Sequence, residues 1–258
     1  MRSRTRSLTG AALGVALVGG LLTAVSAPAL ADTSRPTPIS DARTVETPAV
    51  DLAPGQHLSP EATQWRHHDL DQDPAGTGDL LSWTLPDYDD SAWPLELGPF
   101  GALRGEKQDV SGQPVNTLLT QDKAGTTTNI ETFFFRAEID LDAAELEDIS
   151  RLTGTVRHDD ALAMWVNGEK VGGFLDDAFD PTLGNMQYLG DSRGAPIVST
   201  VNVPGDVLVE GENQIAIALY QDRASSSDIY FNFETLETVA LDEPLTVSDV
   251  VLNVGSDE

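Results

Sequence analysis

Residues 158–174 read HDDALAMWVNGEKVGGF, a pattern typical of two β-strands joined by a tight turn. Asn167-Gly168 is the strongest short hairpin signal, because both central residues of a type I′ turn need a positive φ. The segment before the turn, residues 161–166, is apolar on both faces, as in strands that are covered on both sides. We therefore predict a β-hairpin whose first strand lies in the middle of a sheet.

The amino-terminal segment has the pattern of a secretory signal peptide. A basic start is followed by an apolar run over residues 8–25, and Ala29-Leu30-Ala31 offers an Ala-x-Ala cleavage site. We expect cleavage after Ala31 and a secreted, extracellular protein. The alternative is a membrane anchor. The glycines and small residues of the run argue against it, and no later segment is apolar and long enough to span a bilayer.

The composition disfavours two classes of partner. The chain of 258 residues carries a formal net charge of −27 and no cysteine. This negative charge disfavours nucleic acid and anionic membranes; it favours solubility and could favour divalent cations, or it is only a solvated acidic surface. Without disulfides, an exported protein must take its stability from its core, metals or partners.

The rest of the chain divides into three parts. Residues 32–60 are rich in Pro, Thr, Ser and Ala without a sustained period, and we predict a flexible spacer. Residues 61–238 contain many short strand patterns separated by Gly, Pro and Asp turns, which predicts an all-β jelly-roll β-sandwich. Residues 239–258 form a C-terminal tail with a strand pattern at residues 247–254.

The strand patterns within the predicted sandwich are short and unevenly spaced. We predict strands over residues 63–67, 80–85, 132–141, 149–156, 161–166, 169–174, 197–203, 213–220 and 228–236. We predict one helical turn over residues 143–148. We predict long loops over residues 97–129, which are rich in Gly, Thr, Gln and Asp. The four tryptophans each lie in an apolar pattern, which favours core anchors over a sugar-stacking platform.

Four motifs together resemble one kind of module. They are DDSAW at 89–93, TFFFR at 132–136, the hairpin from Asp159-Asp160 to Asn167-Gly168, and GENQIA at 211–216 leading to SSDIYF at 226–231. Their order and spacing resemble the galactose-binding-domain-like β-sandwich, a module that is similar to the sugar-binding domain of family 2 glycoside hydrolases. Closer counterparts accompany secreted bacterial metallophosphoesterases of the purple-acid-phosphatase type. The resemblance covers roughly residues 64–236.

The resemblance implies a non-catalytic accessory module, either the front module of such a phosphoesterase or a truncated relative of one. Its partner would be the phosphoesterase catalytic domain, and residues 250–258 resemble the first strand of the fibronectin-like domain that precedes it. The alternative is a freestanding carbohydrate-binding module whose partner is a glycan. The Gly-Asn-His motif of the dimetal site is missing, because Met186 follows Gly184-Asn185.

No segment has the motif of an enzyme. The chain lacks a nucleophile elbow, a Ser-His-Asp pattern, a phosphate loop and HExxH. We therefore predict no catalytic residue.

The first candidate ligand-binding residues are Asp159 and Asp160, which precede a strongly apolar strand. Carboxyl groups in this position can accept hydrogen bonds from sugar hydroxyls, act as acid and base, or bind a metal. The alternative is that they begin the strand and pair with Arg157 or Arg136.

The other ligand-binding candidates flank a loop between two predicted strands. They are Tyr220, Gln221, Ser227 and Asp228. Loops at one end of a sandwich are where such folds bind ligands. The alternative is that Ser227 and Asp228 only satisfy the loop's own backbone donors.

Asp69, Asp71 and Asp73 alternate as the oxygen ligands of a calcium loop do, and a structural calcium ion is therefore a hypothesis. The full EF-hand pattern fails, because Pro74 stands in place of the turn glycine and no Glu stands at the twelfth position. The alternative is a solvated acidic loop. We expect no other cofactor.

Overall fold

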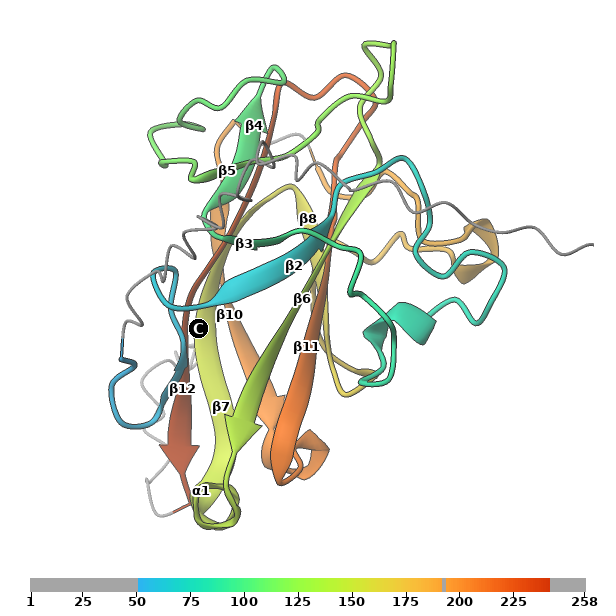
Figure 1. The fold of residues 1–258 in the computed structure, drawn as a ribbon. Helices are drawn as coiled ribbons and strands as arrows, with labels where there is room; N and C mark the ends of the chain where they lie inside the picture. Colours follow the sequence, from blue (N-terminus) through green and yellow to red (C-terminus); the bar gives the residue numbers. More distant parts are fainter. Residues whose placement is uncertain (1–50, 192–193, 242–258) are drawn as a thin grey trace, which may run out of the picture. The chain divides into compact units, whose positions relative to one another are not determined.

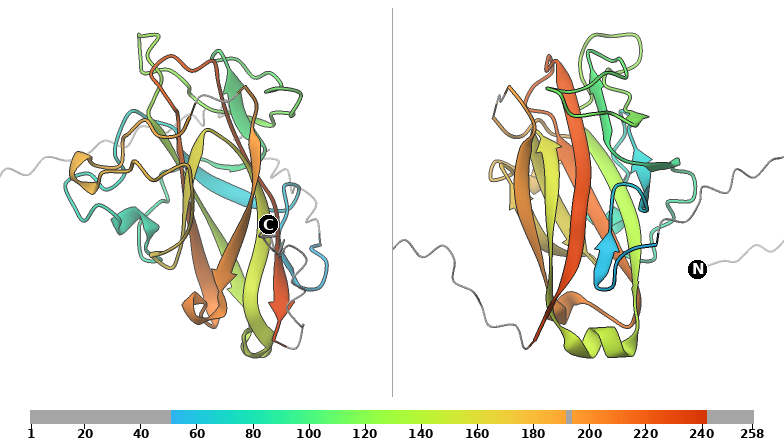
Figure 2. Two further views of the ribbon diagram at one scale, coloured as in Figure 1. Left: turned by 180° about the vertical axis from the view of Figure 1, so that it is seen from behind. Right: turned by 90° about the vertical axis from the view of Figure 1, so that its left-hand side faces the viewer.

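The described part of the chain is a β-sandwich of two sheets (Figures 1 and 2). The computed structural model describes residues 51–191 and 194–241. The predicted signal peptide, most of the predicted spacer and the predicted strand at 247–254 lie outside these residues.

The first sheet has six strands in the order β10–β7–β12–β4–β5, with β1 paired to β12. All of its pairs are antiparallel except β4 with β5. The bounds are β1 Gln56–Leu58, β4 Phe100–Leu103, β5 Thr117–Leu118, β7 Ile149–Asp159, β10 Ile197–Pro204 and β12 Asp228–Ala240.

The second sheet has six antiparallel strands in the order β3–β2–β6–β11–β8–β9. The bounds are β2 Gln64–His68, β3 Leu95–Leu97, β6 Thr132–Leu141, β8 Ala161–Val166, β9 Glu169–Phe174 and β11 Gly211–Tyr220.

Helical segments are short. They are α1 Ala143–Asp148 and the 3₁₀ turns η1 Ser82–Thr84, η2 Pro181–Leu183 and η3 Gly205–Val207. The predicted helical turn is thus confirmed as α1, where Asp142 and Glu145 form a reciprocal capping box. Among residues 51–191 and 194–241, no helix has both the length and the apolar character needed to cross a bilayer.

Two apolar layers explain why β8 is buried on both faces. Leu162 and Met164 belong to the main core between the sheets, whereas Ala163 and Trp165 belong to a second cluster on the outer face of the second sheet. Loop side chains cover this outer cluster, among them Tyr88, Leu175 and Phe179. The prediction of two-sided burial is therefore confirmed. The predicted interior position is also confirmed, because β8 pairs with β11 on one side and with the edge strand β9 on the other.

The predicted hairpin turn is confirmed, with φ of 53° at Asn167 and 85° at Gly168. The carboxamide of Asn167 also joins the hairpin to β11 and η3. Its Nδ2 donates to Val207 O at 3.0 Å and to Asn213 Oδ1 at 2.9 Å, and its Oδ1 accepts from Gln214 N at 2.9 Å. The side chain therefore contributes tertiary contacts as well as turn geometry.

The structure differs from the sequence prediction where strands are short. β1 lies within the predicted spacer, where Leu58 pairs with Leu236 of β12 and is buried. β4 and β5 lie within the predicted long loops, and residues 82–84 form η1 instead of a strand. These segments have too few residues for a period of their own; pairing with a neighbouring strand or burial of Trp83 sets their conformation.

Candidate functional site

One end of the sandwich gathers the strand ends that carry most of the predicted ligand-binding residues. β7 ends at Asp159, β11 ends at Tyr220 and β12 begins at Asp228. The register pairs Tyr220 with Ala161 and Asp159 with Tyr230. Figure 1 shows this end at the top, opposite α1, and we call it the loop end. Antiparallel pairing therefore brings together residues that lie far apart in the sequence.

Asp159 and Asp160 are buried carboxyl groups, 3% and 4% exposed. Burial, together with the charge of the neighbouring Asp159, raises the pKa of Asp160 to about 9. Burial also raises the pKa of Asp159 to about 6, and the charges of Asp228 and Asp222 contribute to this rise. Burial and the mutual repulsion of the two carboxyl groups therefore both favour the protonated form of Asp160.

Asp160 joins β8 to the loop that follows β11. Its backbone N–H donates to Tyr220 O at 3.1 Å, and its Oδ2 accepts from Asp222 N at 2.9 Å. His158 Nδ1 donates to Asp160 O at 2.8 Å. These contacts give the carboxyl pair a structural role at the start of the buried strand.

The expected pairing of this carboxyl pair with Arg157 or Arg136 is wrong. Arg157 Nε pairs with Glu234 at 2.8 Å, and Arg136 Nε pairs with Asp90 at 2.6 Å. Both arginines thus neutralise carboxylates that come from other elements.

Tyr220 and Gln221 are adjacent but differ in their surroundings. Tyr220 packs in the outer apolar cluster against Phe179, with 6.3 Å between ring centroids, and burial raises its pKa. Gln221 is fully buried, and among residues 51–191 and 194–241 neither its Oε1 nor its Nε2 has a hydrogen-bond partner. Buried amides without partners are uncommon in native proteins. Gln221 therefore stays a candidate, whereas Tyr220 serves the core.

A pocket of about 430 Å³ lies at the loop end, and all of its lining side chains are polar. The lining residues are Arg104, Gln121, Asp122, Thr127, Asn129, Ser225, Ser226 and Ser227. Of the predicted residues, only Ser227 lines this loop-end pocket, and its hydroxyl donates to Asp228 Oδ1 at 2.7 Å.

Hydrogen bonds between loops hold the loop-end pocket in shape. Gln121 Oε1 accepts from Gly105 N at 2.8 Å, and its Nε2 donates to Ser226 O at 3.1 Å. Asn129 Nδ2 donates to the same carbonyl at 2.8 Å. Gln121 and Asn129 are both 3% exposed, so these bonds are partly shielded from water. The polar walls are therefore preorganised.

Several polar groups of the loop-end pocket are left for a ligand. In the part of the chain that the structure describes, they have no side-chain partner: the guanidinium of Arg104, the carboxylate of Asp122 and the hydroxyls of Thr127, Ser225 and Ser226. Sequence reasoning missed Arg104, Asp122 and Thr127, because only the tertiary contact of three loops makes them neighbours.

The three aspartates of the calcium hypothesis are held by different parts of the chain. Asp69 accepts a hydrogen bond from Thr120 N at 2.7 Å, and Asp73 accepts one from Asn185 N at 2.9 Å. Asp71 forms an ion pair with Lys123 Nζ at 2.9 Å. Among residues 51–191 and 194–241, no three His, Cys, Asp or Glu side chains form a group that could hold a metal. The structure therefore does not bring these carboxylates together.

The tryptophans are core anchors, as expected. The exposed fractions are 2% for Trp65, 0% for Trp83, 8% for Trp93 and 4% for Trp165. Trp83 contacts Trp165 edge to face at 5.3 Å between centroids. The four rings therefore serve the core, and only a small part of Trp93 also lines a pocket at the surface.

No protein-family model matches the chain, and no curated protein matches it. Similar solved structures include a β-D-mannosidase from Dictyoglomus thermophilum, with 20% identity, a TM-score of 0.23, and coverage of 35% of this chain and 9% of that one. A β-glucuronidase from glycoside hydrolase family 2 has 14% identity, a TM-score of 0.37, and coverage of 69% and 15%. A β-glycosidase from Bacteroides vulgatus has 15% identity, a TM-score of 0.36, and coverage of 68% and 19%.

This chain spans less than a fifth of the length of each of these three proteins. One of them belongs to family 2 of the glycoside hydrolases, the group with the sugar-binding domain that the sequence motifs resemble. None of the three is named as a metallophosphoesterase. At these identities and TM-scores, the similarity assigns no activity, substrate or ligand to the chain.

Proposed function

We propose that this chain is a non-catalytic accessory module of an exported protein and binds a glycan at its loop end. The observation that carries this proposal is the loop-end pocket of about 430 Å³, in which every lining side chain is polar. Its volume lies within the range of about 300 to 1,000 Å³ that is usual for small-ligand sites.

The free groups of the loop-end pocket suit sugar hydroxyls. A hydroxyl both donates and accepts hydrogen bonds. It can accept from the guanidinium of Arg104 and donate to the carboxylate of Asp122, while Ser225 and Ser226 can do either. Because the loops are held by their own hydrogen bonds, binding costs little ordering of the protein.

The non-catalytic part of the proposal is supported by the state of the carboxyl pair. Acid and base catalysis requires direct hydrogen-bond reach of the substrate. Asp159 and Asp160 are nearly inaccessible, and Asp160 Oδ2 is occupied by the backbone N–H of Asp222. Their raised pKa values follow from burial inside the fold and need no catalytic explanation.

The test is affinity electrophoresis of the full chain in gels that contain soluble polysaccharides, followed by calorimetry with the matching oligosaccharides. We expect at least one polysaccharide to retard the protein. Arg104→Gln and Ser225→Ala should each weaken binding at least about fivefold, since each loses a hydrogen bond worth about 1 kcal/mol. Lys107→Gln, an exposed residue outside the pocket, is the control and should leave binding unchanged. No retardation by any polysaccharide would refute the proposal.

A finer proposal is that the module accompanies an exported metallophosphoesterase. It is supported by the motif resemblance alone, among whose residues are Arg136, Asn167-Gly168 and Asp228. The test is to read the DNA downstream of the codon for Glu258 and to express any adjoining phosphoesterase with this chain. Co-purification of the two would support it. An adjoining region without a phosphoesterase domain would argue against it.

A further inference from the structure

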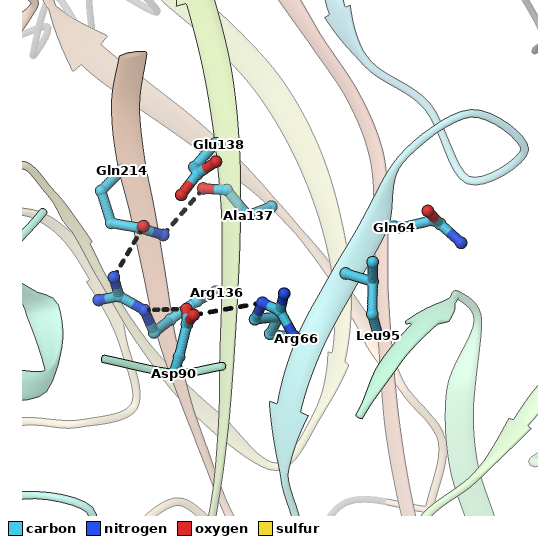
Figure 3. A pocket seen from close by; sticks show the side chains of 8 residues that line it. All are labelled: Gln64, Arg66, Asp90, Leu95, Arg136, Ala137, Glu138 and Gln214. Atoms are coloured by element: carbon cyan, nitrogen blue, oxygen red, sulfur yellow. Dashed lines mark hydrogen bonds and ion pairs between the residues drawn. The ribbon is translucent and has the colours of Figure 1, made fainter. Parts of the chain in front are cut away.

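A second pocket lies on the outer face of the second sheet, with a volume of about 280 Å³. Figure 3 shows its lining residues, which come from β2, β3, β6, β11 and the loop before β3. They are Gln64, Arg66, Asp90, Leu95, Arg136, Ala137, Glu138 and Gln214. This sheet-face pocket shares no residue with the loop-end pocket.

The floor of the sheet-face pocket is the buried guanidinium of Arg136. Its Nε donates to Asp90 Oδ2 at 2.6 Å, its Nη1 to Leu85 O at 3.1 Å and to Trp83 O, and its Nη2 to Gln214 Oε1 at 2.8 Å. Charged groups at this depth are tolerated only when paired and hydrogen-bonded. The bonds also fix the position of the group, so the floor is rigid before a ligand arrives.

Gln214 is held as firmly as the arginine that it contacts. Its Nε2 donates to Ala137 O at 3.0 Å and to Ile215 O at 2.8 Å. The amide of Gln214 and the guanidinium of Arg136 are therefore hydrogen-bonded to other groups of the protein, and together they form the floor. Recognition of a ligand therefore depends on the exposed and partly exposed side chains around the opening of the pocket, those of Gln64, Arg66 and Glu138, which we call the rim.

The rim presents groups that the protein does not use. Arg66 Nε lies 3.2 Å from Asp90 Oδ1 and its Nη1 donates to Trp93 O at 3.0 Å, which leaves its Nη2 available. Figure 3 shows Asp90 between the guanidinium groups of Arg66 and Arg136. Glu138 and Gln64 are exposed, and neither side chain has a partner among the residues that the structure describes. The rim thus offers the guanidinium of Arg66 as a donor, the carboxylate of Glu138 as an acceptor, and the amide of Gln64 as both.

The charges of the sheet-face pocket balance. Two guanidinium groups and two carboxylates line it, although the chain as a whole carries −27. An anionic ligand would meet the unpaired Glu138, and a cationic ligand would meet Arg66. A neutral hydroxyl group can accept from the one and donate to the other without leaving a charge unpaired.

We propose that the sheet-face pocket is a second binding site, for one uncharged sugar ring or a polyol of similar size. Its volume lies just below the usual range of about 300 to 1,000 Å³, which fits a single ring and excludes a long chain. The site goes beyond the glycan binding proposed for the loop end, because it uses other residues. It can therefore be confirmed or refuted independently of the loop-end site.

The test is a titration of the ¹⁵N-labelled full chain, followed by NMR chemical shifts and by calorimetry. The neutral probes are glucose, galactose, mannose and N-acetylglucosamine; glucuronate and glucosamine are the charged counterparts. We expect at least one neutral sugar to shift the amides of residues 136–138 and 214, with a Kd in the millimolar range, and to bind more tightly than both charged counterparts. Methyl glycosides of the neutral sugar distinguish a free sugar from the terminal ring of a glycan as the natural ligand. Loss of binding on methylation indicates a free sugar, and retained binding indicates the terminal ring of a glycan; both outcomes support the site.

Variants separate this site from the loop end. Glu138→Gln and Gln64→Ala should weaken binding, Glu138→Gln about tenfold or more because hydrogen bonds to charged groups are the stronger kind. Glu210→Gln, an exposed glutamate outside both pockets, should leave it unchanged. The changed residues are exposed, and circular dichroism melts confirm that the variants fold. The proposal is overturned if no neutral sugar shifts these amides, if a charged counterpart binds more tightly, or if Glu138→Gln binds as the unchanged chain does.

Discussion

Arg136 and Asp90 form an ion pair, with 2.6 Å between Nε and Oδ2, although 46 positions separate them in the chain. The side chain of Arg136 is 1% exposed and that of Asp90 is 17% exposed. Asp90 also lies 3.2 Å from Arg66, so one carboxylate compensates two guanidinium groups. The pair attaches the loop before β3 to β6, near the middle of the second sheet.

Removal of the Asp90 charge should destabilise the fold strongly. Asp90→Asn leaves the buried Arg136 without its counter-charge, and breaking a buried pair costs about 3 kcal/mol or more. Urea unfolding followed by tryptophan fluorescence measures the change. Asp89→Asn is the matched control, since Asp89 is exposed and an asparagine can still accept from Ser91 N; it should cost less than about 0.5 kcal/mol. Equal losses for the two variants would contradict the role given to Asp90.

The Asp159–Asp160 pair should make the fold less stable as the pH rises. Burial raises both pKa values from an ordinary value of 3.8, to about 6 and about 9, so the folded state keeps protons that the unfolded state has released. The contribution of the pair to stability is therefore greatest below pH 4 and is lost progressively up to about pH 9.

Asp160→Asn imitates the protonated acid and should remove most of this pH dependence. We expect the variant to exceed the unchanged chain in unfolding free energy by about 2 kcal/mol at pH 8, and by little at pH 4. Urea unfolding at a series of pH values measures the difference, with the exposed Asp206→Asn as control. A difference that does not grow with pH would show that the pair is charged in the folded protein.

Asn167→Gly should cost about 2 kcal/mol even though glycine suits the turn. Glycine adopts the positive φ of this position freely, but it loses the carboxamide bonds to Val207, Asn213 and Gln214, and each bond is worth about 1 kcal/mol. Thermal and urea unfolding measure the loss. Ser111→Gly is the control, because Ser111 also has a positive φ, of 49°, but is exposed. A neutral Asn167→Gly would mean that the residue serves only the turn.

Asp73→Ala should destabilise the protein with and without calcium. Its carboxylate accepts from Ala75 N, and from Asn185 N and Nδ2, each at 2.9 Å, so we expect a loss of about 2 to 3 kcal/mol. Asp71→Ala removes only a partly exposed ion pair with Lys123 and should cost about 1 kcal/mol or less. Melts in calcium and in EDTA measure both. A fall in Tm on chelation that Asp73→Ala abolishes would restore the calcium hypothesis.

Long strands could be predicted because their pattern is local. The prediction for residues 132–141 matches β6, and that for residues 161–166 matches β8, since each run carries enough apolar residues to define its burial. β1, β4 and β5 are two to four residues long and exist because they pair with a longer strand or with one another. Their partners lie elsewhere in the chain, so no local pattern marks them.

The candidate site residues, like the strands, could be predicted only where a local sequence pattern marks them. Asp159 and Asp160, and separately Gln221 and Asp228, could be predicted as candidates, because they stand at the ends of strands that the periodicity identifies. The loop-end pocket and the sheet-face pocket could not, because loops and strands distant in the sequence meet to form them.

By itself, the sequence determined the β-rich architecture, the long strands and the Asn167-Gly168 turn, since side-chain alternation and backbone preference act between near neighbours. Only the tertiary structure decided which charges pair. Arg136 meets Asp90, and not the aspartates of the hairpin, because burial and distance are set by the packing of the two sheets and the loops that cover them. The hairpin contributes a buried strand and a carboxyl pair, while the groups left free for a ligand lie in the loop-end and sheet-face pockets.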